Sequence, residues 1–248
     1  IVAGFKTAAD GIAREATLLQ EAKPSLLVWR ADENALVVPR ALARRAGFAD
    51  AATNAHAAGW AMTTRGSGGG IVPQGPGTLN LAMVVPCPPG FSTEDGYQLI
   101  CGALTESLTR FDITSDTGAR HGVFCDGDWN ILVGGRKLAG TAQRWSGSSH
   151  SRVALIHAMI LMDTPDPGLW PVMQQLHEIA LPQAPIPQAQ AHVALHGLMP
   201  ETMATSSFPG ALIRAAEDRL TTVTRQKREA ACFFSIKPIV QLVTEASP

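Results

Sequence analysis

The sequence contains no long apolar segment. None of its 248 residues lie in an uninterrupted apolar run of about 18 residues, the length that a membrane-spanning helix needs. No charged segment precedes an apolar stretch near the first residue, as it would in a secretory signal peptide. We therefore expect no membrane association and a cytoplasmic location.

An excess of positive charge is also missing. The chain has 20 Lys and Arg residues against 21 Asp and Glu residues, which gives a formal net charge of −1. Non-specific binding of nucleic acid needs a strong positive field, so we expect no nucleic-acid partner. A small acidic ligand is still compatible with this composition, because a local cluster of Arg and Lys does not need a basic protein.

The chain has few cysteines, and they follow no pattern. There are four, without a CxxC pair or regular spacing: Cys87, Cys101, Cys125 and Cys232. Scattered cysteines favour free thiols in a reducing compartment over disulfides or a zinc site. Cys101 falls in the middle of an expected helix, where a packing role is the simplest interpretation.

Hydrophobic periodicity and turn residues divide the chain into short elements. The patterns predict helices over residues 10–23, 42–58, 93–110, 169–180 and 209–227, and strands over 25–29, 35–39, 60–65, 78–85, 128–133, 137–143 and 153–162. Residues 145–150 and 181–190 have loop compositions. Because the strands occur in clusters rather than in βαβ units, we predict an α+β fold with a mostly antiparallel or mixed sheet.

A glycine-rich segment, RGSGGGIVPQGPGTLN, spans Arg65–Asn80 and holds six glycines in sixteen residues. It contains no lysine and therefore cannot be a Walker-A loop. The GxG starts at Gly66 and Gly68 do not complete the dinucleotide fingerprint GxGxxG, because Ile71 and Pro73 stand at the final glycine positions. It also joins two expected strands rather than a strand and a helix. Both kinds of nucleotide cradle are excluded.

Two interpretations of these glycines remain open. One is a plain hairpin connection, which is common for glycine-rich turns. The other is a pocket wall, where a ligand lies directly against backbone N–H groups. A short turn needs only one or two glycines, whereas Gly68–Gly70 are consecutive and Gly75 and Gly77 follow. Arg65 at the mouth would give an anionic ligand a bidentate partner.

A second segment, GGRKLAGTAQR, spans Gly134–Arg144 and contains Lys137. Strand alternation predicts that Lys137, Ala139, Thr141 and Gln143 share one face, with Leu138, Gly140 and Ala142 on the other. An exposed basic hairpin is one interpretation. In the other, Lys137 faces inward, and an anion must then accompany it, because a buried unpaired charge is costly.

Together these motifs resemble the lipoate–protein ligase, octanoyltransferase and biotin–protein ligase superfamily. The first is similar to the family's RRxSGGG-x-V segment and the second to its G-x-K-[IVL]-[AS]-G-[ST]-A-[QY] segment. LIHAMIL, at residues 155–161, resembles its HG-x-[IL]-L strand. The motifs agree in order and spacing over residues 10–180. The resemblance implies a class II synthetase-like domain, a central, mostly antiparallel sheet flanked by helices.

The resemblance also implies one catalytic domain over residues 1–248, with a core at 10–182 and a connection and closing helix at 183–248. Lys137 matches the lysine that stabilises the developing oxyanion and, in ligases, contacts the adenylate phosphate. The expected substrate-binding and adenylate-binding residues are Arg65, Ser67, Gly68, Gly69, Gly70, Val72, Asn80, Asp128, Asn130, Gly140, Thr141, Ala142 and His157.

The chain departs from the family pattern in three places. Thr64 replaces the first arginine of RRxSGGG, and Ala158 replaces the glycine of HG. The loop at 145–150 replaces a segment that orders over the adenylate in relatives.

Three activities remain open at this stage. A lipoate–protein ligase would use ATP and Mg²⁺ to activate lipoate or octanoate and pass it to a lysine of a lipoyl carrier domain. A cysteine transferase would instead take octanoate from an acyl carrier protein as a thioester. Cys125 lies near the nucleophile position of one transferase type. Because one sequence does not fix the alignment of Cys125 with that nucleophile position, the sequence favours the ligase. A non-catalytic lipoyl- or biotinyl-binding relative is the third candidate.

Overall fold

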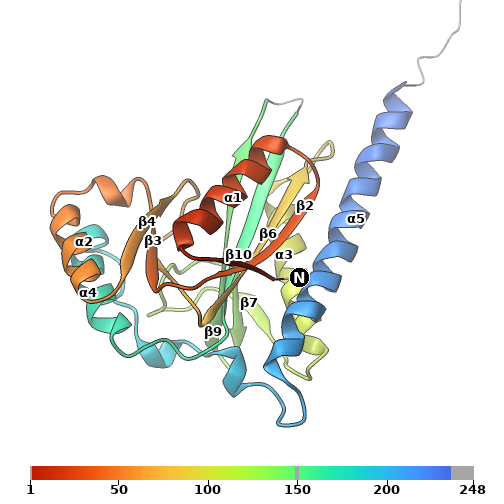
Figure 1. The fold of residues 1–248 in the computed structure, drawn as a ribbon. Helices are drawn as coiled ribbons and strands as arrows, with labels where there is room; N and C mark the ends of the chain where they lie inside the picture. Colours follow the sequence, from red (N-terminus) through yellow and green to blue (C-terminus); the bar gives the residue numbers. More distant parts are fainter. Residues whose placement is uncertain (1, 149–150, 236–248) are drawn as a thin grey trace, which may run out of the picture.

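Seven strands form the main sheet of the computed structural model, which describes residues 2–148 and 151–235 (Figure 1). The strand order is β1-β2-β6-β10-β9-β8-β7, and all neighbours are antiparallel except β1 and β2. The strands are β1 (Ala3–Phe5), β2 (Ser25–Ala31), β6 (Thr78–Pro86), β7 (Asp116–Gly118), β8 (Asn130–Val133), β9 (Arg136–Ser146) and β10 (Val153–Leu161). The α+β class with a largely antiparallel sheet is therefore confirmed.

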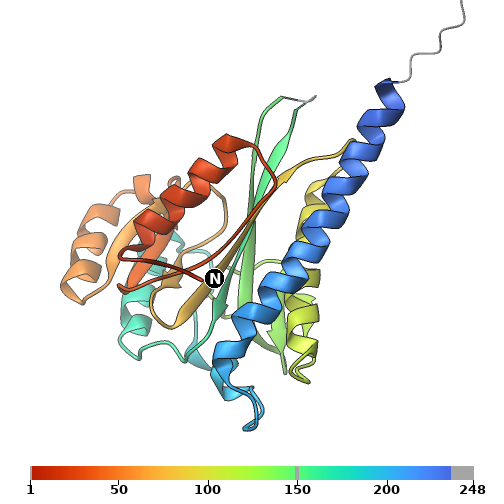
Figure 2. The ribbon, with the colours of Figure 1, turned by 45° about the vertical axis from the view of Figure 1, so that its right-hand side comes forward.

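Helices cover both faces of this sheet (Figures 1 and 2). Helix α1 (Ala8–Glu21) lies on one face, and α3 (Thr93–Thr109) and α5 (Phe208–Ser235) lie side by side on the other. Capping boxes at Thr7 and Ser92 satisfy the free N–H groups at the starts of α1 and α3. The main core lies between the sheet and the α3–α5 pair.

A smaller three-stranded sheet with the order β4-β3-β5 stands beside the first. Its strands are β3 (Ala35–Pro39), β4 (Ala61–Arg65) and β5 (Val72–Gln74). It packs against α2 (Phe48–Ala57) and α4 (Leu169–Ala180) in a second apolar cluster. Short 3₁₀ turns complete the fold at η1 (Leu42–Arg44), η2 (Ala189–Ala191), η3 (Leu195–Gly197) and η4 (Thr205–Ser207).

Some expected elements need correction. The three-residue strands β1, β5 and β7 escaped the sequence analysis, because three residues are too few to show an alternation. Trp145 and Ser146 belong to β9 rather than to a loop, since they pair with Ala154 and Val153. The remainder of that predicted loop includes residues 149–150, which lie outside the described residues.

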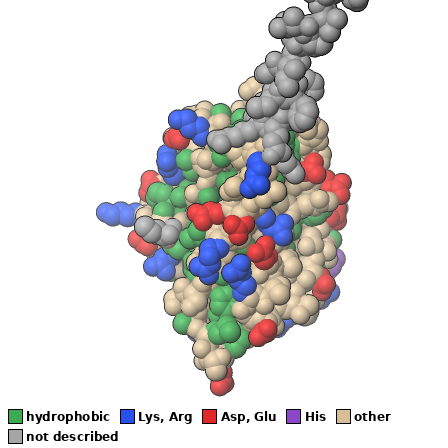
Figure 3. Space-filling model, turned by 90° about the vertical axis from the view of Figure 1, so that its right-hand side faces the viewer, with side chains coloured by type: hydrophobic (Ala, Val, Ile, Leu, Met, Phe, Trp, Pro, Cys, Tyr) green, Lys and Arg blue, Asp and Glu red, His purple; other side chains and the backbone are tan. Residues whose placement is uncertain are grey.

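Charged side chains are interleaved on the face that carries α5, where Lys and Arg lie next to Asp and Glu (Figure 3). An example is the ion pair between Arg219 of α5 and Glu106 of α3, at 3.4 Å. No helix among the described residues is both long and apolar enough to cross a membrane.

Candidate active site

A cavity of about 490 Å³, including its open mouth, lies where the two sheets meet under α1. Its wall combines apolar side chains with a few polar ones: Ile12, Glu15, Trp29, Val37, Arg65, Val72, Gln74, Asn80, Cys125, Gly140, Thr141, Ala142, His157, Ala158 and Met159. Eight of the residues predicted from sequence therefore meet in one place.

Cys125 stands in this wall, in the irregular segment between β7 and β8. Its backbone is left-handed, with φ of 49°, a conformation that non-glycine residues rarely adopt. The Sγ atom accepts a hydrogen bond from the Gly70 N–H at 3.0 Å and lies 3.8 Å from Nη2 of Arg65. An N–H donor and a cation next to a sulfur stabilise negative charge on it. The structure thus places the Cys125 thiol in the cavity wall, a position that the sequence alone could not establish.

Arg65 is buried, not exposed at a mouth as predicted. Its Nη1 donates to the Val37 carbonyl, and its Nη2 donates to the carbonyls of Gly68 and Gly70 at 3.0 and 2.7 Å. Burial lowers the pKa of Arg65, and the nearby Cys125 acts in the opposite direction. Because the two terminal nitrogens already bind backbone carbonyls, the bidentate grip on an anion is not available in this arrangement. The guanidinium instead fixes the glycine loop against the sheet.

The glycines of the loop have a different purpose from the one expected. Gly68, Gly69 and Gly70, like Ser67, do not line the cavity. A Cβ atom on Gly69, where φ is +98°, would lie 2.7 Å from the sulfur of Cys125, and one on Gly70 would lie 3.0 Å from its Cα. Bare backbone is therefore needed at residues 69 and 70 so that the cysteine segment can approach.

Lys137 contacts the segment that carries Cys125 and has only 1% of its surface exposed. Its Nζ donates to the carbonyls of Phe124 and Cys125 at 2.7 and 2.8 Å and lies 5.3 Å from the centre of the Phe124 ring. Burial lowers the pKa of Lys137 to about 8, and Cys125 and Asp126 partly oppose this shift. The inward-facing interpretation of Lys137 is the one that the structure supports.

The predicted alternation along β9 is wrong at Gly140. The pairing of β8 with β9 shifts register between Ile131 and Leu132, which leaves one extra residue on β9. Such a bulge reverses the facing of the residues beyond it. Gly140 therefore comes to the side of Lys137, and a Cβ atom there would lie 2.9 Å from Nζ.

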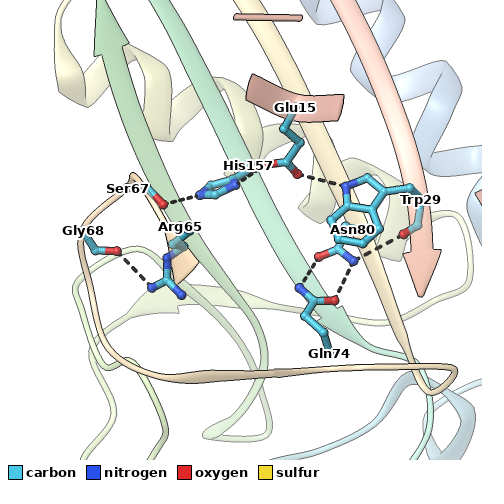
Figure 4. A network of polar contacts seen from close by, with 8 residues as sticks. All are labelled: Glu15, Trp29, Arg65, Ser67, Gly68, Gln74, Asn80 and His157. Atoms are coloured by element: carbon cyan, nitrogen blue, oxygen red, sulfur yellow. Dashed lines mark hydrogen bonds and ion pairs between the residues drawn. The ribbon is translucent and has the colours of Figure 1, made fainter. Parts of the chain in front are cut away.

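A chain of polar contacts joins Glu15, His157 and Ser67 (Figure 4). One carboxylate oxygen of Glu15 lies 2.9 Å from Nδ1 of His157, whose Nε2 lies 3.1 Å from Oγ of Ser67. The other oxygen accepts from the indole N–H of Trp29 at 2.9 Å. His157 of β10 thus connects α1 to the glycine loop.

A second polar group in Figure 4 is a reciprocal amide pair at the cavity wall. Gln74 donates to Asn80 at 2.6 Å, and Asn80 donates back to Gln74 at 2.7 Å and to the Trp29 carbonyl at 3.4 Å. Both amides are buried. Because their polar atoms are hydrogen-bonded to each other, the cost of burying both amides in the wall of a largely apolar cavity is offset.

Asp128 and Asn130 do not join this cavity. Asp128 is exposed, and the side-chain nitrogen of Asn130 donates to Asp126 and to the Gly127 carbonyl. Asn130 therefore shapes the segment that carries Cys125. Among the residues that the structure describes, no group of three His, Cys, Asp or Glu side chains is arranged to hold a metal ion.

Sequence reasoning missed several wall residues, among them Glu15, Trp29 and Gln74. One signal was present for Glu15. It falls between Ile12 and Leu19 on the apolar stripe of α1, where a carboxylate is unexpected unless it has buried partners. Trp29 and Gln74 carry no comparable signal, because their position depends on how the two sheets meet.

Comparison with known proteins agrees with this architecture. The model of the lipoyl protein ligase A/B catalytic domain matches residues 7–214. An octanoyl-[GcvH]:protein N-octanoyltransferase of Kyrpidia tusciae is 32% identical over 146 residues, which is 56% of this chain and 50% of that protein. The chain thus spans about half the length of the curated relatives it matches.

Solved structures show the same fold at low sequence identity. A bi-partite lipoate protein ligase from Thermoplasma acidophilum superimposes with a TM-score of 0.59 and 16% identity, covering 95% of this chain and 91% of that one. Lipoate-protein ligase A bound with ATP gives a TM-score of 0.62 and 17% identity, covering 97% and 94%. On the family-model match, the chain belongs to the lipoyl protein ligase A/B catalytic domain family.

Proposed function

We propose that this protein is an acyltransferase that carries an octanoyl or lipoyl group as a thioester on Cys125 and passes it to a lysine of a lipoyl carrier domain, without ATP. One observation carries the proposal. The Cys125 sulfur lies in the cavity wall, 3.0 Å from the Gly70 nitrogen, and Lys137 donates to the Cys125 carbonyl at 2.8 Å. A thiol with a donor, a cation and a cavity around it suits nucleophilic catalysis.

The residues around the cavity suggest a role for each in the reaction. Cys125 attacks the carbonyl carbon of the donor's acyl group and forms the thioester, while the bond from that carbon to the donor's nitrogen or sulfur breaks and the donor leaves as the protonated amine or thiol. The amine of the acceptor lysine then attacks the thioester carbon, loses a proton as the amide forms, and releases Cys125 as the thiol. Lys137 and Arg65 supply positive charge beside both steps, where negative charge develops on the acyl oxygen. The apolar wall, with Ile12, Val37 and Met159, suits an alkyl chain.

The proposed donor is an octanoylated carrier protein. The Kyrpidia tusciae relative is named for transfer from octanoyl-[GcvH] to protein. An acyl carrier protein, as expected from the sequence, is the other donor to test. The proposed acceptor is a lipoyl domain.

An adenylate-forming ligase, which the sequence analysis put first, is the second candidate. Lys137 is compatible with it, and a structural neighbour is a ligase bound with ATP. That reaction would use ATP and Mg²⁺ and would not need a thiol. The requirement for Cys125 therefore separates the two reactions.

The test measures the mass of an apo lipoyl domain after incubation with the purified protein. One arm supplies octanoyl-GcvH or octanoyl-acyl carrier protein without ATP, and the other supplies lipoate, ATP and Mg²⁺. We expect a gain of mass in the first arm that is lost in Cys125→Ala and kept in Cys87→Ala. A gain only in the second arm, retained in Cys125→Ala and lost in Lys137→Ala, would establish the ligase. No gain in either arm would leave a binding protein.

A further inference from the structure

The backbone around Cys125 needs support from outside its own segment. Residues 119–129 form no helix or strand, and Cys125 has a φ of 49°. A strained conformation of this kind persists only when its surroundings determine it. The carbonyls of Phe124 and Cys125 accept hydrogen bonds from Lys137, and the Cys125 sulfur accepts one from the Gly70 N–H. The buried N–H of Phe124 needs a separate partner.

That partner is His192, from the connection that follows α4. Nε2 of His192 accepts a hydrogen bond from the Phe124 N–H at 3.2 Å, and the two rings stack with centroids 4.1 Å apart and planes at 16°. His192 is 5% exposed and Phe124 is fully buried. The imidazole of His192 therefore holds Phe124, the residue before Cys125, by a hydrogen bond to its backbone and by stacking on its ring.

The tautomer of His192 follows from its contacts. Nδ1 lies 2.8 Å from the Gln188 carbonyl, which can only accept, so the ring proton is on Nδ1. Nε2 is then free to accept from Phe124. Burial, with a smaller contribution from the charge of Lys137, lowers the pKa of His192 to about 4 although the hydrogen bond to Gln188 acts in the opposite direction, so the ring stays neutral. A protonated ring would lose the acceptor.

The same connection is tied to the site at two more points. The backbone N–H of Gln188 donates to the Gly122 carbonyl at 2.8 Å, and that of Val193 donates to the Lys137 carbonyl at 2.9 Å. The Trp170 ring of α4 also contacts His192, with centroids 5.3 Å apart and the two planes at 37°. One short segment, residues 188–193, thus contacts both the cysteine segment and the strand of the lysine.

We infer that His192 is a positioning residue for Cys125: its neutral imidazole fixes the Phe124 N–H and thereby the orientation of the thiol toward Gly70 and Arg65. The inference rests on the proposed role of Cys125 as nucleophile. It also assigns a purpose to the connection after α4, for which the sequence alone gave none.

The test compares two substitutions that separate the hydrogen bond of His192 from its ring stacking. His192→Phe keeps a flat ring but removes the acceptor, and His192→Gln offers an amide oxygen for the Phe124 N–H. His196→Ala, on an exposed histidine four positions along, is the matched control. Two quantities are measured in each variant: kcat and KM for acyl transfer, and the rate of Cys125 alkylation by iodoacetamide, followed on the Cys125 peptide by mass spectrometry.

We expect kcat to fall about 100-fold in His192→Phe with little change in KM, because a small displacement of a nucleophile has effects of this size. Alkylation of Cys125 should slow about 10-fold, since the sulfur loses the donors that stabilise its charge. His192→Gln should recover most of both rates, and His196→Ala should match the parent protein.

Three outcomes would overturn the inference. The first is an unchanged kcat and an unchanged rate of Cys125 alkylation in His192→Phe. The second is an equal loss of kcat in His192→Phe and His192→Gln while both variants stay folded, and the third is faster alkylation of every cysteine, which would indicate general unfolding. Failure of the proposed function would look different. Transfer would then survive Cys125→Ala, and the alkylation measurement would still decide whether His192 positions the thiol.

Discussion

The sulfur of Cys125 and the backbone nitrogen of Gly70 lie 3.0 Å apart, although 55 residues separate them in the chain. This contact joins the glycine loop to the segment between β7 and β8. The glycine loop therefore leaves space for the Cys125 thiol and donates a hydrogen bond to its sulfur.

Gly69→Ala should inactivate the protein. A Cβ atom there would lie 2.7 Å from the cysteine sulfur, on a residue with φ of +98°. We expect acyl transfer to fall about 100-fold and the free energy of unfolding to fall by about 1–2 kcal/mol. Gly68→Ala is the control, since a Cβ atom at Gly68 meets nothing within 4 Å. If both variants transfer at the parental rate, the loop is only a turn. The larger Gly69→Val should behave like Gly69→Ala.

Gly140→Ala should displace the Lys137 amino group. The added methyl group would come within 2.9 Å of Nζ, which is the end of a flexible side chain, so the backbone need not move. The fold should therefore survive with a lowered melting temperature, because the displaced amino group loses its hydrogen bonds to the Phe124 and Cys125 carbonyls, and kcat should fall about 10-fold or more. Gly127→Ala, with no atom within 4 Å of its Cβ, should change neither quantity. Equal kcat in the two variants would contradict a role for the Lys137 amino group.

Stability should decline in mild acid. The pKa of His192 is lowered from 6.5 to about 4 in the folded protein, so the unfolded chain binds the extra proton first. The His192 contribution is fully present above pH 6.5 and is lost as the pH falls toward 4, at about 1.4 kcal/mol per pH unit within that window. Burial lowers the pKa of His177 as well and adds to the slope. Urea unfolding between pH 7 and 4.5 measures it.

His192→Gln provides the comparison for this pH dependence. An amide does not titrate in the range, so the slope should become smaller, with the His177 part remaining. A slope as steep as that of the parent protein would show that other groups cause the acid sensitivity.

The amide pair of Gln74 and Asn80 should show strong coupling. Asn80→Leu leaves the Gln74 amide nitrogen without the partner that it has at 2.6 Å, and should cost about 1–3 kcal/mol of unfolding free energy. In Gln74→Leu with Asn80→Leu, both polar groups are removed, and the loss should be smaller than the sum of the single losses. Strict additivity in urea unfolding would argue against the pair.

The sequence by itself determined much of this protein. Local signals placed β3 and α4 at the bounds that the structure shows, because hydrophobic periodicity acts over a few positions. Three motifs in order pointed to the family and to an inward-facing Lys137. The near-zero net charge of the chain led us to expect no nucleic-acid partner.

Only the tertiary structure decided what the motifs do. The bulge that turns Gly140 toward Lys137 depends on how β8 pairs with β9, which no local pattern records. The meeting of Cys125 with Gly70, and of His192 with Phe124, joins segments 55 and 68 residues apart. Such contacts are set by the packing of whole elements, because the free energy that selects them comes from burial across the fold rather than from neighbours in the chain.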